Sequence, residues 1–240
     1  MTMAGVLFVI GTPIGNLGDI TLRALETLKG ADRIVAEDTR VTKKLLMRYQ
    51  IQKPLFSLHA RSPRSHFEKV IEFVERGERV ALVTDAGTPG ISDPGAFIVS
   101  LVRERCGEKA IVPIPGPSAV TAALSASGVL ADEFLFLGFL PHKKGRQKLL
   151  DEISATKRAV VLYESPHRMR KLLDELLKRS PERHIVIARE LTKLFEEIAS
   201  GTVQETALRF KKGDISGKGE FVVVLAPLHS HSGFRLLGST

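Results

Sequence analysis

Short apolar runs alternate with segments of helical periodicity along the first half of the chain. Continuous apolar runs of this length are typical of buried strands, and apolar residues three or four positions apart form one helix face. The predicted strands are 6–10, 33–36, 55–58, 80–84 and 110–114, and helices are predicted after Thr21, over 42–49, before Gly77 and over 94–105. Helical crossovers between such strands predict an α/β fold with a mainly parallel sheet.

The same alternation restarts after a proline-rich segment, Pro113 to Pro117, which cannot continue a helix or a central strand. The strands predicted beyond it are 134–138, 159–163, 184–188 and 220–225, and the helices are 118–126, 145–155, 168–178 and 203–210. We therefore expect two α/β domains with mainly parallel sheets, 1–114 and 118–228, joined by a stiff linker. A cleft between such domains is a favoured small-molecule site. Residues 229–240 show no pattern and are expected to form a mobile tail.

Two loops rich in glycine and proline follow predicted strands. They are Gly-Thr-Pro-Ile-Gly-Asn at 11–16 and Asp-Ala-Gly-Thr-Pro-Gly at 85–90. Ligands of open α/β sheets lie beyond the carboxyl ends of strands, and small residues let the backbone approach them. Either loop alone could be an ordinary turn, but two of them favour a shared pocket. The first loop is neither a dinucleotide-binding motif nor a Walker A loop.

Seven segments, in this order, resemble a known family. They are GTPIGNLGDIT (11–21), AEDTR (36–40), LVTDAGTPGISDPG (82–95), PGPSAVTAALSASG (115–128), GFLP (138–141), YESPHR (163–168) and ARELTK (188–193). Together they resemble the bacterial ribosomal RNA small subunit methyltransferase I family, over roughly residues 5–228. That family belongs to the S-adenosylmethionine-dependent superfamily with the tetrapyrrole-methylase-like (class III) fold.

The resemblance implies a reaction and a cofactor site. The reaction is 2′-O-methylation of a cytidine in the decoding region of 16S rRNA, by a homodimer that converts S-adenosylmethionine to S-adenosylhomocysteine. The methyl donor is expected between the two domains, and the substrate is 16S rRNA, within the small ribosomal subunit. Residues expected at the donor by resemblance are Ile14, Thr88, Ile91, Ser118 and Ala119, and the two loops add Gly11, Pro13, Asp85, Gly87 and Pro89. Ser118 could equally be a helix cap.

The chain departs from the wider superfamily in both loops. Many members carry Gly-x-Gly-x-Gly-Asp in the first loop, where this chain has Pro13 and Asn16 at the middle glycine and the acid. Relatives carry Gly-Asp-Pro in the second, where this chain has Thr88 between Gly87 and Pro89. These departures match the ribosomal RNA branch and disfavour a corrin-precursor methyltransferase.

Methyl transfer to a hydroxyl needs in-line geometry and benefits from a base that removes the proton. Carboxylates that follow predicted strands are Glu37, Asp38 and Glu190, and Lys193 could lower the pKa of the acceptor hydroxyl or bind a phosphate. Glu37 and Asp38 could instead be charges at a helix N-terminus, and Glu190 part of an ion pair. The candidate catalytic residues are therefore these four, and no one of them is singled out as the base.

Charge favours an anionic partner. The chain has 35 Lys and Arg against 27 Asp and Glu, a net charge of +8. By charge alone, nucleic acid is the first candidate for that partner and an acidic membrane surface the second. We predict nucleic acid and no membrane partner. Candidate phosphate contacts are Arg40, Arg61, Lys143, Lys144, Arg146 and Arg168, although any one could be part of a solvated face.

Cysteine usage and the N-terminus suggest a reducing cytoplasm. Cys106 is the only cysteine, so neither an intramolecular disulfide nor a cysteine zinc site is possible. No metal is expected, because His229 and His231 are better explained as solvated tail residues. The first residues lack the basic region of a signal peptide, and no stretch has membrane-spanning length.

Two other functions are compatible with the same sequence features. One is a methyltransferase of this scaffold acting on a tetrapyrrole or a protein side chain, which would not require the basic clusters. The other is a non-catalytic rRNA-binding assembly factor with a vestigial donor pocket. The intact loop at Gly87, Thr88 and Pro89 argues against the second alternative.

Overall fold

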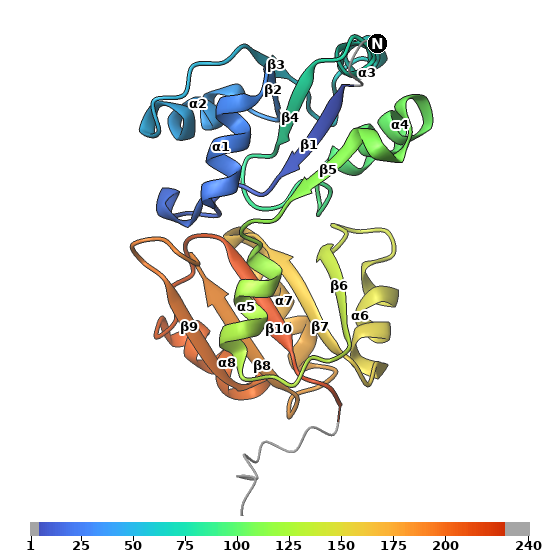
Figure 1. The fold of residues 1–240 in the computed structure, drawn as a ribbon. Coiled ribbons are helices and arrows are strands. Elements are labelled where there is room, and N and C mark those ends of the chain that lie inside the picture. The colour runs from blue at the N-terminus through green and yellow to red at the C-terminus, as the bar shows by residue number, and fades with distance from the viewer. Residues whose placement is uncertain (1–4, 229–240) are drawn as a thin grey trace, which may run out of the picture. The chain divides into compact units, whose positions relative to one another are not determined.

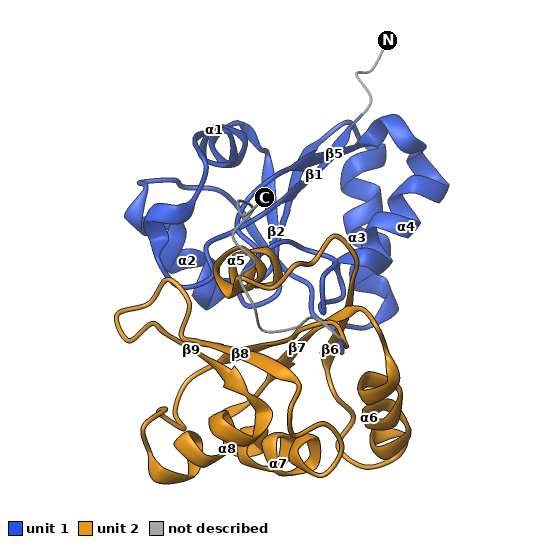
Figure 2. Cartoon of the chain, turned by 90° about the horizontal axis from the view of Figure 1, so that it is seen from below, with its two compact units in different colours: residues 1–118 blue, residues 119–240 orange. Residues whose placement is uncertain are grey.

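The computed structural model describes residues 5–228, so the expected tail at 229–240, with His229 and His231, lies outside the described residues. The chain divides into two compact units, residues 1–118 and 119–240. Figure 1 shows the order of the elements, and Figure 2 distinguishes the units by colour. Each unit has its own sheet and its own covering helices.

Within residues 5–118 the sheet has five strands in the order β3-β2-β4-β1-β5, and every pairing is parallel. The strands are β1 (Val6–Ile10), β2 (Arg33–Ala36), β3 (Leu55–Ser57), β4 (Arg79–Val83) and β5 (Ile111–Ile114). The connecting helices are α1 (Leu22–Gly30), α2 (Thr39–Arg48), α3 (Arg64–Glu75) and α4 (Gly95–Cys106), with short 3-10 helices at Leu17–Asp19 and Glu108–Ala110. The parallel α/β sheet expected for this half is confirmed.

Alternate residues of these strands are buried on opposite faces of the sheet. Leu82 belongs to a core cluster with residues of α3 and α4, whereas its neighbour Val83 packs in a cluster with α1 and α2. Because both faces are covered, the strands are apolar throughout, which is why they were visible in the sequence. Burying one such side chain is worth about 1.5–3 kcal/mol.

The second unit has a different sheet, in the order β6-β7-β10-β8-β9. Its strands are β6 (Phe134–Phe139), β7 (Ala159–Glu164), β8 (His184–Arg189), β9 (Glu197–Thr202) and β10 (Phe221–Leu225). In the described part of this unit, β6 and β7 pair in parallel, but the other three pairings are antiparallel. The expectation of a mainly parallel sheet in this half is therefore wrong.

Two features cause the difference. The strand β10 lies between β7 and β8 and runs against both. The edge strand β9, which pairs with β8, was not predicted because Glu-Ile-Ala-Ser-Gly-Thr is no apolar run. An edge strand has one neighbour and exposes alternate residues, so its sequence carries a weak signal.

Helices cover both faces of this second sheet. Figure 2 shows α5 (Ala119–Ser127) on one face, and α6 (Arg146–Ala155), α7 (Pro166–Leu177) and α8 (Val203–Lys212) on the other. α8 begins with a capping box in which the Thr202 and Glu205 side chains each accept from the other's backbone N–H. α7 begins two residues before the predicted start, because Pro166 occupies a position that helix N-termini favour. Within residues 5–228, no helix has the length and apolar character needed to cross a bilayer.

Candidate functional site

Three loops of the first unit are hydrogen-bonded together at the carboxyl ends of β1, β4 and β5. Thr12 and Gly87 exchange two backbone hydrogen bonds, of 2.9 and 3.1 Å. The Thr88 hydroxyl donates to the Pro117 carbonyl oxygen at 3.1 Å, and Gly11 N donates to Ile114 O at 3.1 Å. The two loops predicted to share a site are thus joined to each other and to the proline-rich segment. We call these residues, 11–14, 87–89 and 115–117, the loop cradle.

The loop cradle requires two glycines in contact. A Cβ atom at Gly11 would lie 2.7 Å from the Cα of Gly116, and one at Gly116 would lie 2.6 Å from the Gly11 carbonyl oxygen. Both atoms belong to the backbone and cannot swing away, so only hydrogen fits at either position. Gly116 was missed from the sequence, although its place between two prolines could have suggested a constrained backbone.

Gly87 is required by its backbone conformation. Its φ angle is +84°, a left-handed value that residues other than glycine rarely adopt. A Cβ there would lie 3.5 Å from Cγ2 of Ile14 and 3.7 Å from the Pro117 oxygen, which is ordinary contact. The Cα of Gly87 therefore faces Ile14 and Pro117 at close range.

Buried threonines tie the cradle to the sheet. The Thr12 hydroxyl lies 3.2 Å from both the Thr84 and the Gly87 carbonyl oxygens, and Thr12 is 3% exposed. Thr12 lies inside the first glycine-rich loop, but its partners lie in the second loop and directly before it, about seventy residues away. Sequence reasoning missed both threonines because nothing local identifies a buried hydroxyl.

The other predicted donor residues lie around these loops. Pro13 and Pro89 are buried, Ile14 and Thr88 are half-buried, and Ile91 is 45% exposed. Ser118 ends the first unit and Ala119 begins α5 in the second. Asp85 is exposed at the end of β4.

Acidic side chains after β2 and β4 form a connected group in the first unit. One Asp85 carboxylate oxygen accepts from Asp38 N at 2.8 Å, and Glu37 Oε2 accepts from the Thr84 hydroxyl at 2.9 Å. Glu37, Asp38 and Asp85 therefore lie at the same edge of the sheet as the loop cradle. This is the convergence expected for loops that follow neighbouring parallel strands.

Asp38 is engaged as a helix cap. Its carboxylate accepts from Arg40 N at 2.8 Å and pairs with the Arg40 guanidinium at 2.6 Å. These hydrogen bonds lower the pKa of Asp38 to about 2. The Asp38 carboxylate is consequently a weak base, and the helix-terminus interpretation describes it better than a catalytic one.

Glu190 and Lys193 form an ion-pair group in the second unit, after β8. Lys193 Nζ lies 2.9 Å from Glu190 Oε1 and 2.8 Å from Glu220 Oε2, and Glu190 Oε1 also accepts from Glu220 N. The hydrogen bond from Lys193 lowers the pKa of Glu190. Burial lowers the pKa of Lys193, but Glu220 and Glu190 outweigh it and raise that pKa.

The loop that carries this group has an unusual backbone. Glu190 and Thr192 have φ angles of +49° and +65°. Left-handed conformations of such residues cost free energy, on the order of 1–3 kcal/mol, and cluster at functional sites. The strain supports a role for the loop beyond connecting two strands.

The predicted phosphate contacts separate into exposed and buried residues. Arg40, Arg61, Lys143 and Lys144 are exposed, the two lysines in the loop before α6. Arg146 is 2% exposed and makes hydrogen bonds of 2.9 and 2.7 Å to Glu175 Oε2, so its prediction as an RNA contact is wrong. Arg168 is half-buried and its guanidinium pairs with the buried Glu164 at 2.7 Å, and its role as an RNA contact stays a prediction.

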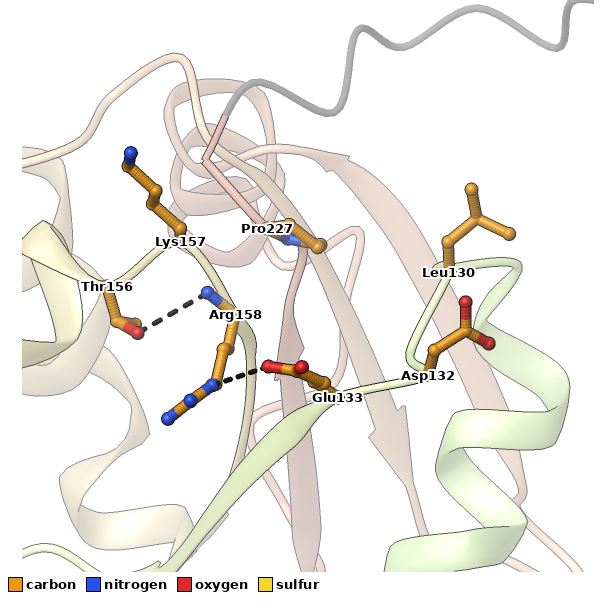
Figure 3. A pocket seen from close by; sticks show the side chains of 7 residues that line it. All are labelled: Leu130, Asp132, Glu133, Thr156, Lys157, Arg158 and Pro227. Carbon is orange, nitrogen blue, oxygen red and sulfur yellow. Dashed lines mark hydrogen bonds and ion pairs between the residues drawn. The ribbon is translucent and has the colours of Figure 1, made fainter.

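A pocket of about 510 Å³ in the second unit is lined by none of the predicted residues. Figure 3 shows the residues that line it, with Arg158 paired to Glu133 at 2.8 Å. Lys157 and Arg158 precede β7, and Asp132 and Glu133 precede β6, so the pocket lies at the amino ends of both strands. Ligands of α/β sheets sit at the opposite ends, and we do not assign the site here.

Known proteins resemble this chain over most of its length. The family model described as Tetrapyrrole (Corrin/Porphyrin) Methylases matches residues 6–207. The ribosomal RNA small subunit methyltransferase I of Halalkalibacterium halodurans is 45% identical over 223 residues, covering 92% of this chain and 75% of that protein. The protein of the same name from Thermotoga maritima is 43% identical over 224 residues, covering 92% and 98%. This chain belongs to the ribosomal RNA small subunit methyltransferase I family.

Solved structures agree on the fold of this methyltransferase family member. The methyltransferase CobJ has a TM-score of 0.66 at 21% identity, covering 93% of this chain and 95% of that one. A uroporphyrin-III C-methyltransferase from Thermus thermophilus, complexed with S-adenosylhomocysteine, has a TM-score of 0.64 at 17% identity, covering 92% and 97%. The resemblance identified from the seven segments, the tetrapyrrole-methylase fold and the S-adenosylmethionine-dependent class are thereby confirmed.

Proposed function

We propose that this protein transfers the methyl group of S-adenosylmethionine to the ribose 2′-hydroxyl of a cytidine in the decoding region of 16S rRNA. The single structural observation that carries the proposal is the loop cradle, in which Thr12 and Gly87 join the two glycine-rich loops. Membership of the family supports the ribosomal RNA substrate, because the named relatives are small subunit rRNA methyltransferases. The cytidine and its ribose hydroxyl rest on the resemblance.

The residues of the loop cradle fit a methyl donor. Ile14 is half-buried and offers apolar surface, and Thr88 and the backbone of the loops offer hydrogen-bonding groups. S-adenosylmethionine, when bound, supplies an electrophilic methyl group on a cationic sulfonium. A strong anionic contact would stabilise the charged reactant more than the transition state, in which that charge is dispersing. The apolar character of the cradle suits this requirement.

The acceptor side needs a group that orients or removes the hydroxyl proton. Asp38 is a poor base because its pKa is about 2. Glu37 and Glu190 remain the candidates, and we propose that at least one of them orients or deprotonates the acceptor. Lys193, held protonated by two carboxylates, would stabilise negative charge on the acceptor oxygen or bind a phosphate.

Incorporation of labelled methyl tests the reaction. Wild-type protein, labelled S-adenosylmethionine and 16S rRNA should give label in alkali-resistant dinucleotides, because a 2′-O-methyl group blocks attack on the adjoining phosphate. Free rRNA and assembled small subunits should be compared as substrates, with protein omitted as the control. Label only on a base, a protein or a tetrapyrrole would contradict the ribose assignment, and RNA binding without incorporation would favour the assembly-factor alternative.

The exposed loop lysines supply a second test. Replacing Lys143 and Lys144 with alanine should weaken RNA binding and leave S-adenosylmethionine binding unchanged. The slope of log affinity against log salt should shrink by roughly 0.7–0.9 for each phosphate that the protein no longer neutralises. Filter binding over a salt series would measure it. Lys157→Ala with Lys178→Ala removes equal charge from exposed sites of the same unit outside this loop, and should leave the slope unchanged.

The homodimer implied by the resemblance is part of the proposal. Leu194 and Phe195, in the loop before β9, are 89% and 67% exposed. Neighbouring apolar side chains with this much exposure are typical of surfaces that another protein covers.

A further inference from the structure

Four buried or nearly buried charged side chains form a network between α6, α7 and the end of β7. Arg146 pairs with Glu175 at 2.7 Å and lies 3.8 Å from Glu164, which pairs with Arg168 at 2.7 Å. Side-chain exposure is 2% for Arg146, 0% for Glu164, 11% for Glu175 and 15% for Arg168. The two positive and two negative charges balance.

The network holds the loop that joins β6 to α6. Arg146 Nη1 donates to the Pro141 carbonyl oxygen at 3.2 Å, and Arg168 Nη1 donates to the Leu140 oxygen at 2.9 Å. The backbone N–H of Arg146 donates to the Lys143 oxygen at 3.2 Å. Both arginines therefore fix the base of the loop, while residues 141–145, which include Lys143 and Lys144, are exposed.

Helix packing alone does not account for the network. Leu150, Ile153, Leu172 and Leu176 already pack α6 and α7 in the core. Buried ion pairs are often no more stabilising than apolar residues of similar volume. Here Glu164 Oε2 is buried without a hydrogen-bond partner, which adds to the cost of burial. What the arginines provide, and apolar residues cannot, is donors to the loop carbonyls.

We propose that Arg146, Arg168, Glu164 and Glu175 are positioning residues that hold the 141–145 loop in one conformation, so that Lys143 and Lys144 meet RNA phosphates together. This inference rests on the proposed RNA substrate. A loop that is already ordered loses less conformational freedom on binding, which favours affinity. Arg146 thus affects RNA binding without touching RNA.

Mutational coupling and loop exchange test the positioning role. Arg146→Met should raise amide hydrogen exchange across 142–146 and weaken RNA binding about as much as the alanine pair at Lys143 and Lys144, on the order of tenfold. Adding Arg146→Met to the alanine pair should cause no further loss of RNA affinity, because the contacts of Lys143 and Lys144 with RNA phosphates are already absent. If Arg146→Met does not fold, Glu175→Gln serves as the test variant, because it keeps the side-chain shape and removes only the charge. Its effects on loop exchange and RNA affinity should lie between those of the wild type and of the alanine pair.

Arg183 provides the matched control. It is a 6% exposed arginine of the same unit that donates to carbonyl oxygens of Ile153, Arg158 and Ala226, none of which belongs to the loop. Burial lowers the pKa of Arg183 to about 10. Arg183→Met should lower the melting temperature but preserve both loop protection and RNA affinity measured well below that temperature.

The outcomes separate this inference from the proposed function. Wild-type loop exchange in Arg146→Met, a further loss in the triple variant, or an equal RNA defect in Arg183→Met would each overturn the positioning role. Unchanged RNA affinity in the lysine pair would also overturn it, while methyl incorporation by the wild type would still support the proposed function. Absence of incorporation into RNA by the wild type would instead count against the proposed function, and the loop-exchange comparison would still decide whether the network orders the loop.

Discussion

Gly87→Val is expected to abolish binding of S-adenosylmethionine at concentrations where the wild type is saturated. Valine would force a branched side chain into a backbone with a φ angle of +84°. It would also extend the chain past a Cβ position already 3.5 Å from Ile14 and 3.7 Å from the Pro117 oxygen. Relief of the strain would separate the loops that Thr12 and Gly87 join. Calorimetric titration with S-adenosylmethionine or S-adenosylhomocysteine measures the result.

Gly107→Val is the control that distinguishes the effect of backbone strain from damage to the donor site. Gly107 has a φ angle of +83°, and a Cβ there would meet nothing within 4 Å. Both variants should lose stability, by about 1–3 kcal/mol for an unfavourable backbone conformation, as thermal unfolding would measure. Only Gly87→Val should lose donor binding. Wild-type affinity in Gly87→Val, or an equal loss in Gly107→Val, would remove the loop cradle from the donor site.

Glu37→Gln and Glu190→Gln should both preserve donor binding, and at least one should lower turnover by about 10²–10⁴-fold. Glutamine keeps the size and a hydrogen-bonding oxygen but cannot take up the hydroxyl proton. In Glu37→Gln the contact with the Thr84 hydroxyl can persist, so a lower turnover would report the charge rather than the packing. Single-turnover methylation of rRNA, with donor saturating, measures the chemical step.

Each variant has a control carboxylate in the same unit. Glu78→Gln removes a charge that pairs with Arg33 at 3.0 Å, before β4 and so at the opposite edge of the sheet from Glu37. Glu220→Gln removes the other carboxylate that pairs with Lys193, at 2.8 Å, and leaves Glu190 intact. Both controls should keep turnover within a few-fold of wild type. Unimpaired turnover in both Glu37→Gln and Glu190→Gln would exclude these two residues as the base.

The sequence predicted the first sheet well because its strands are buried on both faces. Leu82 and Val83 pack in different core clusters, and a run of apolar residues is the direct trace of such double burial. In the second sheet the buried strands β8 and β10 left the same kind of trace, whereas the edge strand β9 did not. Apolar runs identify strands but not their direction, so β8 and β10 were located correctly while their antiparallel pairing was not foreseen.

The candidate site was predictable where local sequence and position agree. The two glycine-rich loops were found because they follow apolar strands, and their contact at Thr12 and Gly87 follows from β1 and β4 being neighbours. Arg146 was misassigned because it follows two exposed lysines and a glycine in a basic segment. Its burial depends on Glu175, twenty-nine residues later, and such a partner cannot be recognised from the neighbours of Arg146.

The contact between Gly11 and Gly116 sets where this chain can be divided for separate expression of its halves. The segment 115–117 lies beyond the last strand of the first sheet, yet Gly116 packs on Gly11 and Pro117 accepts from Thr88. A fragment that stopped at Ile114 would leave the Gly11 backbone without its covering chain and the Thr88 hydroxyl without that acceptor. A fragment that continues through Ser118 keeps both, so the cloning boundary belongs after the prolines rather than before them.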